Sequence, residues 1–187
     1  KRSRVRILTE QSASKEITEL AKNLRLLLLD VDGVLTDGGI ILNGNSEETK
    51  RFNVQDGMGI TLAQACGIRV GIITSRTSKV VERRAKELKI EEVMQDVPRK
   101  TDALEILLEK HQIEAAQACY IGDDIQDTPV MKLVGVPIAV QNAVPLVKEC
   151  SVYVTQAAGG HGAVREAVEW ILTLRGQNAQ AYAAVIG

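Results

Sequence analysis

Short apolar runs alternate with segments of helical periodicity along nearly the whole chain. Six of the runs have the length of buried strands: 24–31, 69–74, 92–95, 117–121, 136–140 and 152–154. The clearest helix is expected near the carboxyl end, where Val164, Ala167, Val168, Ile171 and Leu172 recur at helical spacing. This alternation predicts an α/β fold: a doubly wound, mostly parallel, Rossmann-like sheet with helices on both faces.

One segment interrupts the alternation. Residues 38–54 contain two short apolar or mixed runs around a Gly/Asn turn, which predicts a β-hairpin that projects from the sheet edge. With 187 residues, the chain is expected to form a single domain, 1–187, with its core at about 20–175 and no separate cap domain. The first ~15 residues and the tail 176–187 have weak patterns, and we expect them to be mobile or ordered only against a neighbouring subunit.

Composition narrows the classes of partner. The net charge is -1 and aromatic residues make up 3% of the chain, so neither nucleic acid nor an acidic membrane is an expected partner. No run approaches the ~20 apolar residues of a membrane span. The three cysteines, Cys66, Cys119 and Cys150, form no metal or redox motif, and a reducing cytoplasm is the expected compartment.

Polar side chains gather at the carboxyl ends of the expected strands, where parallel sheets bind their ligands. They are Asp30, Asp32 and Asp37 after the first strand, Thr74, Ser75 and Arg76 after the second, and Asp123, Asp124 and Asp127 after the fourth. Lys100 begins the helix after the third strand. Clustered carboxylates repel one another unless a cation intervenes, and hard oxygen ligands favour Mg²⁺. A magnesium site at this edge of the sheet is therefore expected.

These residue types suit phosphoryl transfer. Asp30 and Asp32 flank one residue, so one carboxylate can attack a phosphoryl group while the other moves a proton. Mg²⁺, the Lys100 ammonium and the Thr74 hydroxyl can neutralise or hold the transferring group. A phosphatase that works through an aspartyl-phosphate intermediate is the predicted activity.

The same residues resemble the four ordered motifs of the haloacid dehalogenase superfamily of phosphatases. The motifs are Asp30-Val31-Asp32-Gly33-Val34-Leu35-Thr36, Thr74 at a strand end, Lys100, and Gly122-Asp123-Asp124-Ile125-Gln126-Asp127. The resemblance implies that Asp30 is the nucleophile and that Asp32 is the general acid/base. It also implies that Asp30, Asp123 and the Asp32 backbone carbonyl bind the metal. Asp124 and Asp127 would then orient a water or Lys100, while Thr74, Ser75, Arg76 and Lys100 bind phosphate and substrate.

Within the superfamily the chain is similar to a capless branch that acts on sugar-acid phosphates, over about residues 20–175. This similarity implies a homotetramer in which hairpins and tails help close a neighbour's site. Two positions depart from relatives that act on 3-deoxy-D-manno-octulosonate 8-phosphate: Gln55 stands where they often have Arg, and His161 where they have Lys or Arg. Arg76 matches them, so the octulosonate is preferred and a nine-carbon sugar-acid 9-phosphate stays open.

Two readings from other classes use the same residues. A signalling receiver also combines clustered Asp, a strand-end Thr or Ser, Lys and Mg²⁺ on such a sheet. Receivers, however, carry an acidic pair after the first strand and a single phosphoacceptor two strands later. Here Asp30 and Asp32 follow the first strand, and Asp123 comes only after the fourth, next to a second carboxylate, Asp124. The order of the parts therefore differs from that of a receiver. A phosphatase-like module kept only for oligomerisation would tolerate loss of catalytic residues, and none of the set is missing.

Overall fold

The computed structural model describes residues 15–42 and 48–186, so the expectation for the first ~15 residues falls almost entirely outside the described part. A six-stranded sheet with the order β5-β4-β1-β6-β7-β8 forms the centre of the molecule, and all of its neighbouring strands are parallel. Its strands are β1 (Leu26–Leu29), β4 (Arg69–Ile73), β5 (Glu92–Met94), β6 (Ala118–Gly122), β7 (Val136–Ala139) and β8 (Tyr153–Val154). The predicted doubly wound α/β fold is confirmed.

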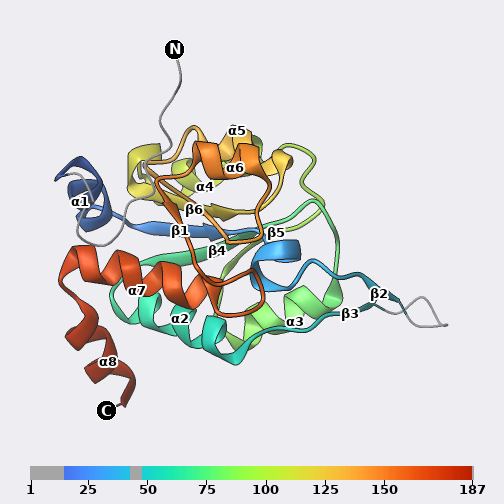
Figure 1. Ribbon diagram of the computed structural model, residues 1–187, viewed down its shortest axis with the longest axis horizontal. Coiled ribbons are helices and arrows are strands. Elements are labelled where there is room, and N and C mark those ends of the chain that lie inside the picture. The colour runs from blue at the N-terminus through green and yellow to red at the C-terminus, as the bar shows by residue number, and fades with distance from the viewer. Residues whose placement is uncertain (1–14, 43–47, 187) are drawn as a thin grey trace.

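Helices cover both faces of this sheet (Figure 1). One face carries α4 (Lys100–His111), α5 (Thr128–Met131) and α6 (Pro145–Cys150). The other carries α2 (Val54–Ala65), α3 (Lys79–Glu87) and α7 (Ala163–Arg175). The remaining helical segments are α1 (Lys15–Lys22), α8 (Asn178–Ile186) and the short turns η2 (Val31–Leu35), η3 (Ala115–Gln117) and η4 (Ile125–Asp127).

Burial explains why these segments form these elements. The four leucines of β1 are completely buried, as expected for a central parallel strand covered on both faces. The stripe predicted for the last long helix is confirmed: Val164, Ala167, Val168, Ile171 and Leu172 all lie inside the core, on α7. Close packing of these apolar side chains provides the main stabilisation of the fold.

The hairpin exists, but it differs from the prediction. Its strands are only β2 (Ile41–Leu42) and β3 (Glu48–Thr49), which pair antiparallel in a sheet of their own. It extends away from the body of the molecule (Figure 1). The predicted second strand ends early because Asn53 begins α2 as its N-cap, where its side chain accepts a hydrogen bond from the Gln55 amide.

The tail is also different from the expectation. Residues Asn178–Ile186 form helix α8, which packs against α2 of the same chain and buries Ala181. Gly176 ends α7 in the left-handed conformation, with φ of 66°, and the chain then turns back toward α2. This segment therefore has regular structure without a neighbouring subunit.

The topology places one crevice at the carboxyl ends of β1 and β6. After β1 the chain crosses toward β4, whereas after β6 it crosses toward β7, so the loops leave these adjacent strands in opposite directions. Such a switch point is where open parallel sheets bind ligands. Asp30 and Asp123 follow these two strands directly.

Candidate active site

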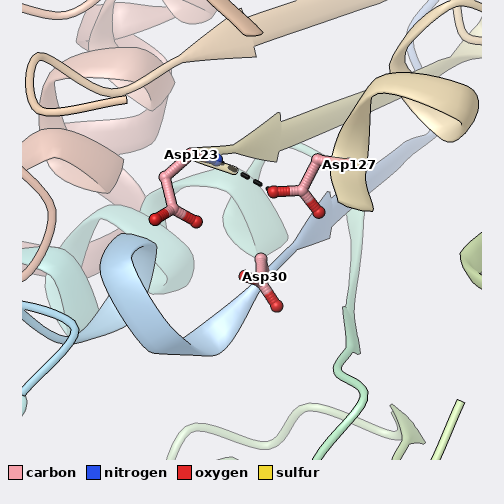
Figure 2. Close-up of side chains that lie close together, drawn as sticks. All are labelled: Asp30, Asp123 and Asp127. Carbon is pink, nitrogen blue, oxygen red and sulfur yellow. Dashed lines mark hydrogen bonds between the residues drawn. The ribbon is translucent and has the colours of Figure 1, made fainter. Parts of the chain in front are cut away.

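Three carboxylates meet at the switch point. Asp30 follows β1, Asp123 follows β6 and Asp127 ends η4. One carboxylate oxygen of each residue lies within 4.8 Å of one from each of the other two, and Figure 2 shows the three side chains together. They line a pocket of about 160 Å³. The other residues of its wall are Asp32, Thr74, Ser75, Arg76, Lys100, Asp124 and Gln126. Of the residues predicted to gather here, the structure brings all but Asp37 to this pocket; Asp37 is exposed and pairs with Arg51 instead. Of the described residues in the wall, only Gln126 was not predicted.

Lys100 is the buried cation of the cluster. Its Nζ lies 2.8 Å from Asp30 Oδ1 and 2.7 Å from Asp127 Oδ1, and its side chain is almost inaccessible to solvent. Burial lowers the pKa of Lys100, but the adjacent Asp30 and Asp127 carboxylates outweigh it and raise the pKa above the ordinary value. The ammonium is therefore charged and fixed beside Asp30.

Asp127 organises this corner of the site. Its Oδ1 accepts a hydrogen bond from the Tyr120 hydroxyl at 2.7 Å as well as pairing with Lys100. Its Oδ2 accepts the Asp123 and Asp124 amides at 2.9 and 3.2 Å, the first of which is drawn in Figure 2. With both oxygens engaged in this way, Asp127 connects Lys100 to the loop that carries Asp123.

The electrostatics of the cluster fit a divalent cation. Burial, followed by the charges of Asp30, Asp127 and Asp124, raises the pKa of Asp123 to about 8. Burial also raises the pKa of Asp30 to about 6, although Lys100 opposes this shift. Asp123 Oδ1 is buried without a hydrogen-bond partner among the described residues. Mg²⁺ prefers oxygen ligands, and it would neutralise the negative charges of these closely spaced carboxylates.

Asp32 has a different environment from the other carboxylates. Its Oδ1 contacts Lys50 Nζ, and its Oδ2 lies 3.5 Å from Arg76 Nε. Glu48 Oε1 lies 3.1 Å from Lys50 Nζ and 2.7 Å from Arg76 Nη2. Sequence reasoning missed Lys50 and Glu48, because neither follows a strand of the main sheet and no spacing connects them to Asp32.

The remaining predicted residues lie along the pocket wall. Thr74 is buried, and its hydroxyl accepts the Arg76 amide at 3.3 Å; Ser75 is exposed between them. The exposed Asp124 caps η4, where its side chain accepts the Ile125 amide at 2.7 Å. Asp124 therefore has the helix-capping role that Asp often takes, while also lining the pocket.

A glycine-rich loop supports the segment after Asp30. A Cβ on Gly159 would lie 1.6 Å from the Gly33 carbonyl oxygen, so only glycine permits this approach. Asn142 Oδ1 accepts the Gly159 amide at 2.7 Å, and the buried Asp56 accepts the Gly162 and Arg165 amides at the start of α7. Gly33 itself has φ of 100°, and a Cβ there would lie 2.0 Å from Asp123 Oδ2. Glycine at this position allows the two halves of the site to meet.

Nothing about Asp56 or Asn142 in the sequence indicated this supporting role. Both are single polar residues whose partners lie far away along the chain.

Among the described residues, no helix is long and apolar enough to cross a membrane.

Known proteins are similar in sequence to this chain. A family model for haloacid dehalogenase-like hydrolases matches residues 89–167. The 3-deoxy-D-manno-octulosonate 8-phosphate phosphatase KdsC of Escherichia coli strain K12 is 46% identical over 164 residues, which are 88% of this chain and 87% of that protein.

Solved structures of phosphatases with the same name are similar in fold to this chain. The 3-deoxy-D-manno-octulosonate 8-phosphate phosphatase of Moraxella catarrhalis, in complex with a magnesium ion, a phosphate ion and a KDO molecule, aligns with a TM-score of 0.88 at 41% identity. The alignment covers 94% of this chain and 100% of that one. The Yersinia pestis phosphatase of the same name aligns with a TM-score of 0.85 at 42% identity, covering 88% and 89%. The predicted resemblance is confirmed: this chain belongs to the haloacid dehalogenase-like hydrolases, in the family of the KdsC-type phosphatases.

Proposed function

We propose that this chain is a Mg²⁺-dependent phosphomonoester hydrolase whose substrate is a sugar-acid phosphate, namely 3-deoxy-D-manno-octulosonate 8-phosphate. The observation that carries the proposal is the pocket in which Asp30 lies against Lys100 and beside Asp123. A nucleophilic carboxylate, a buried ammonium and a second carboxylate at one switch point are the parts that phosphoryl transfer needs. The related phosphatases at 46% identity support the same activity.

The Asp30 and Asp123 carboxylates and the backbone carbonyl of Asp32 would hold the magnesium ion. When bound, the ion neutralises negative charge on the phosphoryl group and on the crowded carboxylates. Asp127 is assigned a positioning role, because both of its oxygens already accept hydrogen bonds. Asp124 is placed next to the ligand set as an orienting residue.

Catalysis then has two balanced steps. A carboxylate oxygen of Asp30 attacks phosphorus, the bond from phosphorus to the sugar oxygen breaks, and Asp32 gives its proton to that oxygen. In the second step Asp32 takes a proton from water, whose oxygen attacks phosphorus. The bond from phosphorus to Asp30 then breaks, which restores the carboxylate and releases inorganic phosphate. Lys100, Thr74 and Ser75 hold the phosphoryl oxygens throughout.

Two features bear on the choice of substrate. Arg76 lines the pocket and is the proposed partner of the substrate carboxylate. Gln55 and His161, the two departures from the octulosonate pattern, are both exposed. Fewer cations would then face the substrate carboxylate than in relatives with Arg or Lys at these two positions. For this reason a nine-carbon sugar-acid 9-phosphate stays the second candidate.

We further propose a homotetramer located in the cytoplasm. The hairpin supports the assembly, since Ile40, Ile41 and Leu42 are more than half exposed and offer an apolar surface to a neighbour. The free thiols of Cys66, Cys119 and Cys150 are consistent with a reducing compartment. Light scattering of the purified chain tests the tetramer.

A substrate screen tests the function. Phosphate release is measured for the octulosonate 8-phosphate, a nine-carbon sugar-acid 9-phosphate and simple sugar phosphates, with Mg²⁺ and with EDTA. We expect multiple turnovers that require Mg²⁺, with the highest kcat/KM for the octulosonate. A single phosphorylation event without turnover would instead indicate a receiver. The absence of any Mg²⁺-dependent hydrolysis would contradict the proposal.

A further inference from the structure

A closed ring of four charged side chains surrounds the Asp32 carboxylate. Lys50 contacts Asp32 Oδ1, and Arg76 Nε lies 3.5 Å from Asp32 Oδ2. Glu48 Oε1 completes the ring, at 3.1 Å from Lys50 and 2.7 Å from Arg76. The four residues come from three segments: the loop after β1, the returning arm of the hairpin and the loop after β4.

Lys50 is the buried member of this ring. Its side chain is only 1% exposed, whereas that of Arg76 is 40% exposed. Removing an ammonium from water is costly unless it is paired, and here two carboxylates compensate for that cost. The position of Lys50 is therefore determined by Asp32 and Glu48, and solvent has little part in it.

The contacts constrain how Asp32 can rotate. Each of its two carboxylate oxygens contacts a different cation, one on either side of the group. Because Glu48 also pairs with the buried Lys50, the hold on Asp32 from that side is firm, whereas Arg76 Nε makes only a long ion pair, without a hydrogen bond. A general acid needs such orientation, since proton transfer requires hydrogen-bond reach to the leaving oxygen.

We propose that Lys50 is a positioning residue that holds the Asp32 carboxyl group in the orientation from which its protonated form gives a proton to the leaving oxygen. This proposal rests on the phosphatase function proposed above. Lys50 acts only through Asp32, with Glu48 as its support. The segment that contains Glu48 and Lys50 thus contributes to catalysis through Asp32.

The dependence on leaving group provides the test. A sugar alkoxide is a poor leaving group and needs a proton, whereas p-nitrophenolate leaves without one. Because Asp32 is also the proposed base of the second step, which both substrates share, kcat/KM is the quantity to compare: it reports only the steps up to departure of the leaving group. For K50M we expect kcat/KM on the sugar-acid phosphate to fall about 10- to 100-fold, a part of the full general-acid contribution. On p-nitrophenyl phosphate we expect kcat/KM to stay within about threefold of wild type, because that leaving group needs no acid.

Controls separate this role from general damage to the fold. R51M removes the neighbouring cation, which pairs with Asp37 at 2.7 Å and is largely exposed, and it should behave as wild type. K50R keeps the positive charge and should retain a larger share of kcat/KM on the sugar-acid phosphate than K50M. Where K50M does not fold, K50Q keeps a polar side chain at this buried position and should show the same difference between the two substrates.

A double-mutant comparison provides the sharpest measurement. If Lys50 acts through Asp32, then K50M should cost almost nothing further in a D32N background. An equal loss of kcat/KM on both substrates, or a full additional loss of kcat/KM on the sugar-acid phosphate in the D32N background, would overturn the inference. A wild-type chain that hydrolyses neither substrate would contradict the proposed function itself, so the two failures are distinguishable.

Discussion

Lys100 Nζ lies 2.8 Å from Oδ1 of Asp30, so the proposed nucleophile and its buried cation form a direct ion pair. Lys100 reaches this point as the first residue of α4, and Asp30 reaches it as the residue after β1. The pair is in turn connected through Asp127 to the loop of Asp123. One hydrogen-bonded unit therefore holds Asp30, Lys100 and Asp123 together, which are the proposed nucleophile, phosphate-binding cation and metal ligand.

Asp127 should be important for stability as well as for activity. D127N keeps the shape of the side chain but removes the charge that faces the buried Lys100. We expect the free energy of unfolding to drop by about 1–3 kcal/mol, because the buried Lys100 keeps only Asp30 as a charged partner and the Tyr120 hydroxyl loses its charged acceptor. Urea denaturation measures this change. D124N, at an exposed position, is the matched control and should change stability by less than about 1 kcal/mol. Equal effects of the two substitutions would contradict this account of Asp127.

Stability should depend on pH in a direction set by the raised carboxylates. In the folded chain, the pKa of Asp123 is about 8 and that of Asp30 about 6, against an ordinary value of 3.8. Above pH ~4 the folded state therefore binds more protons than the unfolded state, and stability is lost as pH rises toward ~8. Thermal denaturation in EDTA, from about pH 5.5 to about pH 8.5, should show a falling Tm.

Magnesium should reverse that trend. A bound cation favours the ionised carboxylates, so the stabilisation by Mg²⁺ should grow with pH over the same range. D123N removes the group with the most strongly raised pKa, and it should flatten the EDTA curve and abolish most of the Mg²⁺ effect. A Mg²⁺-induced shift in Tm that is the same in D123N and wild type would place the metal elsewhere.

The contact between Gly159 and Gly33 predicts a strong effect of one methyl group. In G159A the new Cβ would have to lie 1.6 Å from a backbone oxygen, so one of the two loops must move. We expect a loss of at least about 2 kcal/mol in the free energy of unfolding and a lower kcat, since Gly33 follows Asp32. G67N is the control: Gly67 has φ of 75°, no described atom lies within 4 Å of the position that a Cβ would take there, and Asn tolerates that conformation. Wild-type kcat in G159A would show that this contact is not needed.

Local sequence pattern was enough to predict the main elements of the fold. The six strands and α7 were found because short apolar runs mark the strands and a clear helical stripe marks α7. The carboxyl-end rule then placed Asp30, Thr74, Lys100 and Asp123 together without any contact information. Helix α8 was missed because its alanine-rich segment favours a helix without showing a marked apolar stripe.

Contacts between distant segments could not be predicted in this way. Lys50 and Glu48 reach Asp32 only because the hairpin turns back onto the loop after β1. Asp56 caps α7 from α2, across a separation that no local spacing indicates. Such partners are set by tertiary packing, so the supporting residues of the site emerge only from the structure, whereas the residues proposed to react were already named from the sequence.

The central claim is that Asp30 becomes phosphorylated during turnover. Rapid acid quench of the enzyme with substrate and Mg²⁺, followed by mass spectrometry of its peptides, tests this most directly. We predict a phosphoryl group on Asp30 that hydroxylamine removes, and no phosphorylated peptide and no turnover in D30N. A phosphoryl group on another residue, or turnover by D30N at the wild-type rate, would contradict the account.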